Sequence, residues 1–157
     1  MTEADYALGK TRISATYKAA ESACNALAGN AKDICAEQAL GNRRVALAEL
    51  ESGRSGKIGG LNKVAVAQAD ANFAVAKERC DDTAGNVKDV CMKEAEAAHT
   101  SALADARMGK QIGEARTEAA DEKRNAEFKV AIEKCDAASG DAKSQCVVAA
   151  KTKFGKN

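Results

Sequence analysis

The 157-residue sequence contains no proline and no tryptophan, and aromatic residues make up only 3% of it. It has a single histidine and no apolar run that approaches the ~18 residues of a membrane-spanning helix. The missing apolar run excludes a membrane span, and the missing proline removes the strongest breaker of helices. The 24 basic and 23 acidic residues nearly cancel. This balance argues against nucleic acid as the main partner, because phosphate binding needs a basic surface.

Alanine, glutamate, lysine and arginine dominate what remains, and all four are strong helix formers. The composition therefore predicts an all-α fold. Alanine buries little apolar area, so the hydrophobic core is expected to be thin and to leave a small margin over chain entropy. In such a chain we expect covalent cross-links to contribute much of the stability.

All six cysteines occur in pairs with ten residues between the partners, in the segments CNALAGNAKDIC, CDDTAGNVKDVC and CDAASGDAKSQC. The pairs are Cys24 with Cys35, Cys80 with Cys91, and Cys135 with Cys146. A glycine follows each first cysteine by five positions, at Gly29, Gly85 and Gly140. The pattern is an internal repeat of about 55 residues.

Each glycine suits the left-handed position that ends a helix, and the next residue (Asn30, Asn86 or Asp141) is a good N-cap for a second helix. The repeat therefore predicts three antiparallel αα-hairpins that turn at the glycines. The two cysteines of a pair are equally far from their turn and face each other, which predicts a disulfide within each hairpin. A thiol-rich metal site is the alternative, and it requires a reducing compartment.

The predicted organisation is hairpin 1 over residues 1–51, a flexible Gly/Ser-rich linker over 52–60, hairpin 2 over 61–108 and hairpin 3 over 109–157. The second junction contains only Gly109 and Gly113. The sequence leaves open whether the chain breaks there or one long helix joins hairpins 2 and 3.

No catalytic, cofactor-binding or metal-binding residue is predicted. His99 follows Glu96 at the spacing of half a di-iron carboxylate motif, but a second such motif is missing, so His99 is expected to be a solvated helix residue. An aromatic residue stands seven positions before each first cysteine, at Tyr17, Phe73 and Phe128. We expect these rings to fill the space between helices.

The three cysteine segments and the C-terminal KTKFGKN together resemble a family of small, alanine-rich, secreted proteobacterial proteins that are often labelled TolA-like cell envelope biogenesis proteins. The resemblance covers most of the chain. It implies export to the periplasm and disulfide bonds, and it brings no established activity and no catalytic residues. The polar N-terminus MTEADYALGK does not look like a signal peptide, so a mature form without its leader is expected.

Two functional classes follow. The first is a non-enzymatic structural or interaction protein of the cell envelope, periplasmic or secreted, whose partners are further copies of itself in an oligomer or filament, or another envelope protein. The second is a periplasmic binding or stress protein that holds a small ligand, a metal ion or an unfolded client between hairpins. If the chain assembles, the mobile linker predicts that hairpin 1 swings out to a neighbour; an intramolecular bundle is the alternative.

Overall fold

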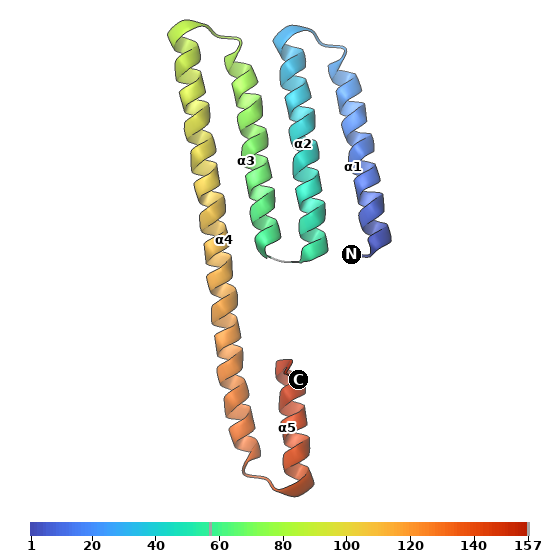
Figure 1. Cartoon of the computed structure of the whole chain (residues 1–157), viewed down its shortest axis with the longest axis vertical. Coiled ribbons are helices and arrows are strands. Elements are labelled where there is room, and N and C mark those ends of the chain that lie inside the picture. Colours follow the sequence, from blue (N-terminus) through green and yellow to red (C-terminus); the bar gives the residue numbers. More distant parts are fainter. Residues whose placement is uncertain (57, 157) are drawn as a thin grey trace. The chain divides into compact units, whose positions relative to one another are not determined.

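The protein is described by a computed structural model that covers residues 1–56 and 58–156. All regular structure in these residues is helical, which confirms the all-α prediction. Figure 1 shows the order of the elements. The helices are α1 (Glu3–Cys24), α2 (Gly29–Ser55), α3 (Ile58–Cys80), α4 (Gly85–Cys135) and α5 (Gly140–Phe154).

The chain divides into two compact units, Met1–Gln111 and Ile112–Asn157. The first unit contains hairpin 1, formed by α1 and α2, and hairpin 2, formed by α3 and residues 85–111 of α4. The second unit is hairpin 3, formed by residues 112–135 of α4 and by α5. Helix α4 has no break between Gly109 and Gly113, so of the two alternatives that the sequence left open, the continuous helix is the one found.

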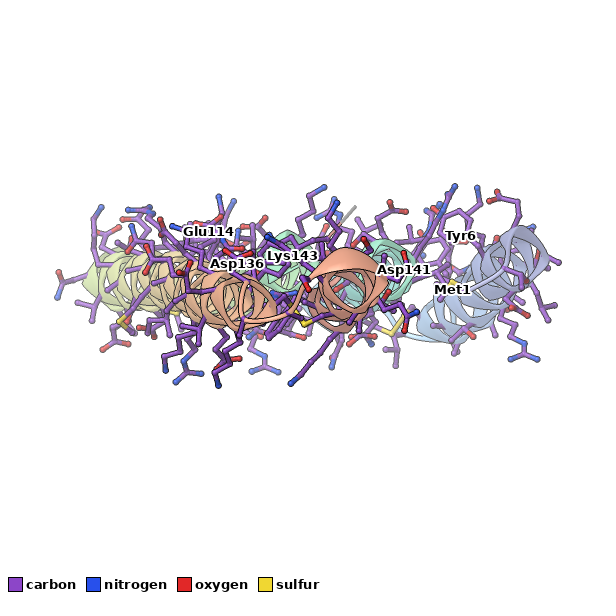
Figure 2. All side chains as sticks on the ribbon, turned by 90° about the horizontal axis from the view of Figure 1, so that it is seen from below. Met1, Tyr6, Glu114, Asp136, Asp141 and Lys143 are labelled. Atoms are coloured by element: carbon purple, nitrogen blue, oxygen red, sulfur yellow. A yellow bond between two sulfur atoms is a disulfide. The ribbon has the colours of Figure 1, made fainter. Side chains whose placement is uncertain are left out.

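Within the first unit, α1, α2, α3 and the first part of α4 lie side by side in a single layer (Figures 1 and 2). Helix α2 packs against α1 on one side and against α3 on the other. On its far side, α3 contacts α4, where the rings of Phe73 and His99 meet. Among the described residues of the first unit, no second layer of helices covers either face of this layer.

The buried side chains among the described residues are small. Apart from the first cysteine of each disulfide they are all alanines, namely Ala39, Ala69, Ala71, Ala95, Ala106 and Ala150. Small side chains let helix axes approach closely and leave little apolar area to bury. The thin core expected from the composition is therefore present as lines of alanine between neighbouring helices.

The connection between hairpins 1 and 2 is shorter than the predicted 52–60 linker, so that prediction was wrong in its extent. Helix α2 continues to Ser55 and α3 begins at Ile58, while Lys57 lies outside the described residues. The glycines here have structural roles. Gly56 ends α2 with a φ of 60°, and a Cβ added to the buried Gly60 would lie 2.8 Å from the Cα of Ser52. Glycine at position 60 thus permits close contact between α2 and α3.

The turns also differ in detail from the prediction. Gly29 has a φ of 56°, but α1 already ends at Cys24, and Ala28 occupies the N-cap of α2 without a side-chain cap bond. Asn30 therefore does not cap its own helix. Its side-chain amide instead donates a hydrogen bond of 2.6 Å to the carbonyl of Glu78. That carbonyl lies in the last turn of α3 and also accepts a hydrogen bond of 3.1 Å from the backbone N–H of Asp81.

Candidate functional site

The three predicted disulfides are present: Cys24–Cys35, Cys80–Cys91 and Cys135–Cys146, with Cα separations of 5.5, 5.6 and 5.6 Å. The first cysteine of each pair is buried, and the second is half-buried. Each bond joins the last residue of one helix to the second turn of the next. In each hairpin the disulfide therefore fixes the two helices close to the point where the chain reverses.

Further from the turn, each hairpin is joined by a second contact, and it uses equivalent positions of the repeat. The aromatic residue seven positions before the first cysteine meets the residue eight positions after the second cysteine. Arg43 lies over the Tyr17 ring with its Cζ atom 5.0 Å from the centroid. The rings of Phe73 and His99 stack at 4.5 Å, and the rings of Phe128 and Phe154 meet edge to face at 6.0 Å.

The sequence prediction recognised only one half of this contact. The aromatic residues were expected between helices, but their partners are an arginine, a histidine and a phenylalanine, which share no residue type. What they share is a flat group that packs against a ring. The signal that identifies them is the constant spacing of eight residues after Cys35, Cys91 and Cys146, which is one residue further from the turn than the aromatic residues are.

The expectation that His99 is a solvated residue was wrong. Its side chain is only 21% exposed, and its Nε2 atom lies 2.7 Å from Oδ1 of Asp70. Since its ring also stacks on Phe73, the single histidine of the chain joins α4 to α3. Glu96, which suggested half of a metal site, forms an ion pair with Lys93 instead.

Ion pairs cross two of the three turns at equivalent positions. Lys88 lies 2.6 Å from Asp81, and Lys143 lies 2.8 Å from Asp136, a pair labelled in Figure 2. The hydrogen bond from Lys88 to Asp81 raises the pKa of that lysine. Hairpin 1 has Asn25 at the position of the aspartates, so the charge that would attract its lysine is missing.

One face of the first unit contains an open groove of about 540 Å³ across α2, α3 and α4. Four carboxamide side chains line it, together with Arg79, Glu94 and small apolar residues. The carboxamides are Gln38 and Asn42 from α2 and Gln68 and Asn72 from α3. Gln68 donates a hydrogen bond of 2.9 Å to Asn72. Such a surface offers both hydrogen-bond donors and acceptors to a polar ligand.

No helix in the described residues is both long and apolar enough to cross a membrane. No group of three or more histidine, cysteine, aspartate or glutamate side chains in them is arranged to hold a metal ion. Comparison of the chain with family models, with curated proteins and with solved structures found no match.

Proposed function

We propose that this chain is a non-enzymatic structural or interaction protein of the bacterial cell envelope, which works in the periplasm or outside the cell. The observation that carries the proposal is the combination of three local disulfides with a first unit whose described helices form a single layer. The first feature supports an oxidising location, and the second supports a role in presenting surface.

The disulfides support the location because bonds of this kind persist in secreted and periplasmic proteins and are rare in the cytosol. All six cysteines are used within their own hairpins, and no free thiol remains among the described residues. Each bond closes a short loop, which in the chain-entropy account contributes about 3 kcal/mol to stability. For helices that pack through alanine, this is a large share of the stability.

The open layer supports a role in binding through surface. Large apolar side chains remain exposed on it, including Leu8, Leu61, Val90 and Met108, with exposed fractions from 48 to 65%. Repeat architectures in which each unit touches only its neighbours commonly present extended surfaces to partners. A partner that covers these side chains would bury apolar area that the chain cannot bury alone.

The groove of carboxamides favours a second candidate, a periplasmic binding protein for a small polar ligand. Asn42 and Asn72, which line the groove, lie beside the close contact of Gly41 with Ala71, so their backbone positions are fixed by the packing of α2 on α3. A ligand held there would exchange hydrogen bonds with the amides. This candidate predicts a molecule that remains bound after gentle purification.

The two candidates separate in protein that has been exported to a bacterial periplasm and purified without reductant. Thiol titration should find no free cysteine, and native mass spectrometry should give the mass of the chain or of whole multiples of it. A retained small molecule that is lost on Asn42→Ala or Asn72→Ala substitution would favour the binding protein. Free thiols in freshly isolated native protein would contradict the proposed location.

A further inference from the structure

The groove across α2, α3 and α4 carries its carboxamides at heights that the packing of α2 on α3 determines. Gly41 of α2 is level with Ala71 of α3, because a Cβ on Gly41 would lie 2.7 Å from the Cβ of Ala71. Gly60 is level with Ser52 for the same reason, so the two helices are antiparallel in a single register. At a rise of about 1.5 Å per residue, this register gives the height of each groove residue along the helices.

The four carboxamides alternate between the two helices along the groove. Their order is Gln68 of α3, Asn42 of α2, Asn72 of α3 and Gln38 of α2, with a step of about 3 Å from each Cα level to the next. All four residues are exposed, whereas Gly41 and Ala71 between them are buried. The groove therefore presents two staggered rows of amides, one from each helix, above small residues.

The repeat does not require amides at these positions. The equivalents of Gln68 and Asn72 are Arg12 and Thr16 in hairpin 1 and Lys123 and Glu127 in hairpin 3; those of Gln38 and Asn42 are Glu94 and Ala98 in hairpin 2 and Ala149 and Lys153 in hairpin 3. Asparagine is a weaker helix former than alanine, yet Asn42 and Asn72 stand inside α2 and α3. Residues that disfavour their own local structure are expected where they serve a function.

The amides retain hydrogen-bonding groups for a ligand. Among the described residues, Gln68 donates to Asn72, and no hydrogen bond involves the side chains of Gln38 or Asn42. The bond between Gln68 and Asn72 leaves the oxygen of Gln68 and the N–H groups of Asn72 for other partners. Each of the four side chains thus keeps at least one donor and one acceptor.

The two charged residues that line the groove have opposite signs. Arg79 belongs to α3 and Glu94 to α4, and both are close in sequence to the cysteines of the Cys80–Cys91 disulfide, which also lines the groove. Their formal charges cancel, so the lining as a whole is polar without a net charge. Such a surface favours an uncharged polar ligand over a polyanion.

An extended peptide has the spacing of these amides. It rises about 3.3 Å per residue, and successive residues direct their backbone N–H and C=O groups to opposite edges of the strand. A carboxamide offers an acceptor oxygen and N–H donors, as a peptide group does. Alternating amides about 3 Å apart therefore match the backbone groups of successive residues, whatever side chains the peptide carries.

We propose that the groove binds an extended peptide segment of a partner protein through its backbone, with successive residues bonded in turn to amides of α3 and of α2. This is recognition of the kind that an exposed sheet edge provides, in which main-chain hydrogen bonds supply the affinity. The inference rests on the proposed function, for which it specifies the chemistry that the interaction surface recognises.

Nuclear magnetic resonance on the intact, oxidised and isotope-labelled chain tests the proposal. The probe is a capped dodecapeptide of alternating threonine and serine, which is uncharged and contains a residue that favours extended backbone. The side-chain amide signals of Gln38, Asn42, Gln68 and Asn72 should shift together with one dissociation constant. The signal of Gln111, which does not line the groove, should stay in place.

Asn42→Ala and Asn72→Ala should each weaken binding about fivefold, because each removes a hydrogen-bonding side chain. Alanine is the better helix former, so circular dichroism should show no loss of helix in either variant. Gln111→Ala is the matched control, since it removes an exposed carboxamide of α4 outside the groove and should leave the dissociation constant unchanged. Equal weakening by Gln111→Ala, or none by the two asparagine variants, would contradict the proposed site.

A second peptide separates recognition of the backbone from recognition of side chains. It has the same side chains, but every second backbone nitrogen is methylated, so one edge lacks N–H donors. Binding should weaken at least about tenfold. Equal binding of the two peptides would overturn the inference, and so would amide shifts caused by an uncharged oligosaccharide but not by the peptide. Absence of any shift at millimolar peptide would overturn it as well, but not the proposed envelope role, which free thiols in native protein would contradict.

Discussion

The two units of the molecule are built from the same hairpin but depend on different contacts. In the first unit, hairpins 1 and 2 share a seam between α2 and α3, and Asn30 adds a hydrogen bond from one hairpin to the other. Hairpin 3 relies on its own disulfide, the edge-to-face contact of Phe128 with Phe154 and the ion pair of Lys143 with Asp136. The comparison indicates that a repeat with a neighbour is less dependent on its own cross-links.

The largest effect should come from removing the disulfide of hairpin 3. In a Cys135→Ser/Cys146→Ser variant we expect the free energy that keeps α5 folded to fall by about 3 kcal/mol. Amide hydrogen exchange in α5 should then be roughly a hundredfold faster. The matched variant, Cys24→Ser/Cys35→Ser, should change the exchange of α2 much less, because α2 still packs against α3. Equal losses of protection in α5 and α2 would remove the distinction between the units.

The next effect concerns the seam itself. Gly41→Leu should destabilise the first unit by about 1–3 kcal/mol, because even a Cβ at this position meets Ala71 at 2.7 Å and its backbone Cα at 3.3 Å. Both tyrosines of the protein are in hairpin 1, so urea unfolding followed by tyrosine fluorescence reports on this unit.

Gly109→Ala is the control for this substitution. It adds a methyl group inside α4 that meets no side chain and no other helix within 4 Å, and it should raise helix stability by up to about 1 kcal/mol. If Gly41→Leu were as stable as the natural chain, α2 and α3 would not be in close contact.

The hairpins and disulfides were predictable because equal spacing from a glycine turn is a property of the sequence itself. Equal spacing alone points to Asn42, Ala98 and Lys153, seven residues after the second cysteines, whereas the partners of the aromatic residues lie one position further on, at Arg43, His99 and Phe154. The single layer was not predictable, because it depends on which glycines permit close approach. Gly60 looks like a linker residue in the sequence, whereas in the structure its lack of a side chain brings α3 against Ser52. Asn30 looks like an N-cap, but its amide bonds to a helix 48 residues away.

A smaller difference in stability is expected between the ring contact of hairpin 2, Phe73 with His99, and that of hairpin 1, Tyr17 with Arg43. His99→Ala removes both the stack on Phe73 and the hydrogen bond with Asp70, which together contribute about 1–2 kcal/mol. Arg43→Ala removes a contact between a cation and the Tyr17 ring that contributes about 0.5–1 kcal/mol. Thermal unfolding should therefore show a larger decrease in Tm for His99→Ala.

His99→Phe tests the two parts of this contact separately. It places at position 99 the residue that hairpin 3 has at the equivalent position 154, so the stack should remain while the bond to Asp70 is lost. We expect a Tm between those of the natural chain and His99→Ala. A Tm equal to that of His99→Ala would mean that the hydrogen bond, and not the ring contact, carries the stabilisation.

The smallest effect concerns the open end of hairpin 1, far from its disulfide. Tyr6 donates a hydrogen bond of 2.9 Å to Glu51, and Arg54 lies 4.4 Å from the Tyr6 ring and 3.2 Å from Glu3. The hydrogen bond to Glu51 is the main cause that raises the pKa of Tyr6 above its usual value of 10.0. Because the pKa of Tyr6 is higher in the folded chain than in the unfolded chain, the hydrogen bond from Tyr6 to Glu51 stabilises the fold fully below pH 10. This stabilisation is lost as the pH rises through the pKa of folded Tyr6.

Absorbance titration can measure this directly, because the chain has only two tyrosines. The pKa of Tyr17 is raised in the same way by its hydrogen bond to Glu21, so both phenols should titrate above the usual value. Glu51→Gln should lower the midpoint of Tyr6 alone, and Glu21→Gln that of Tyr17 alone. A Glu51→Gln variant with an unchanged titration would show that Tyr6 does not join α1 to α2 in solution. The open end of hairpin 1 would then depend on the ion pair of Arg54 with Glu3 and on the close packing of Leu50 against Gly9.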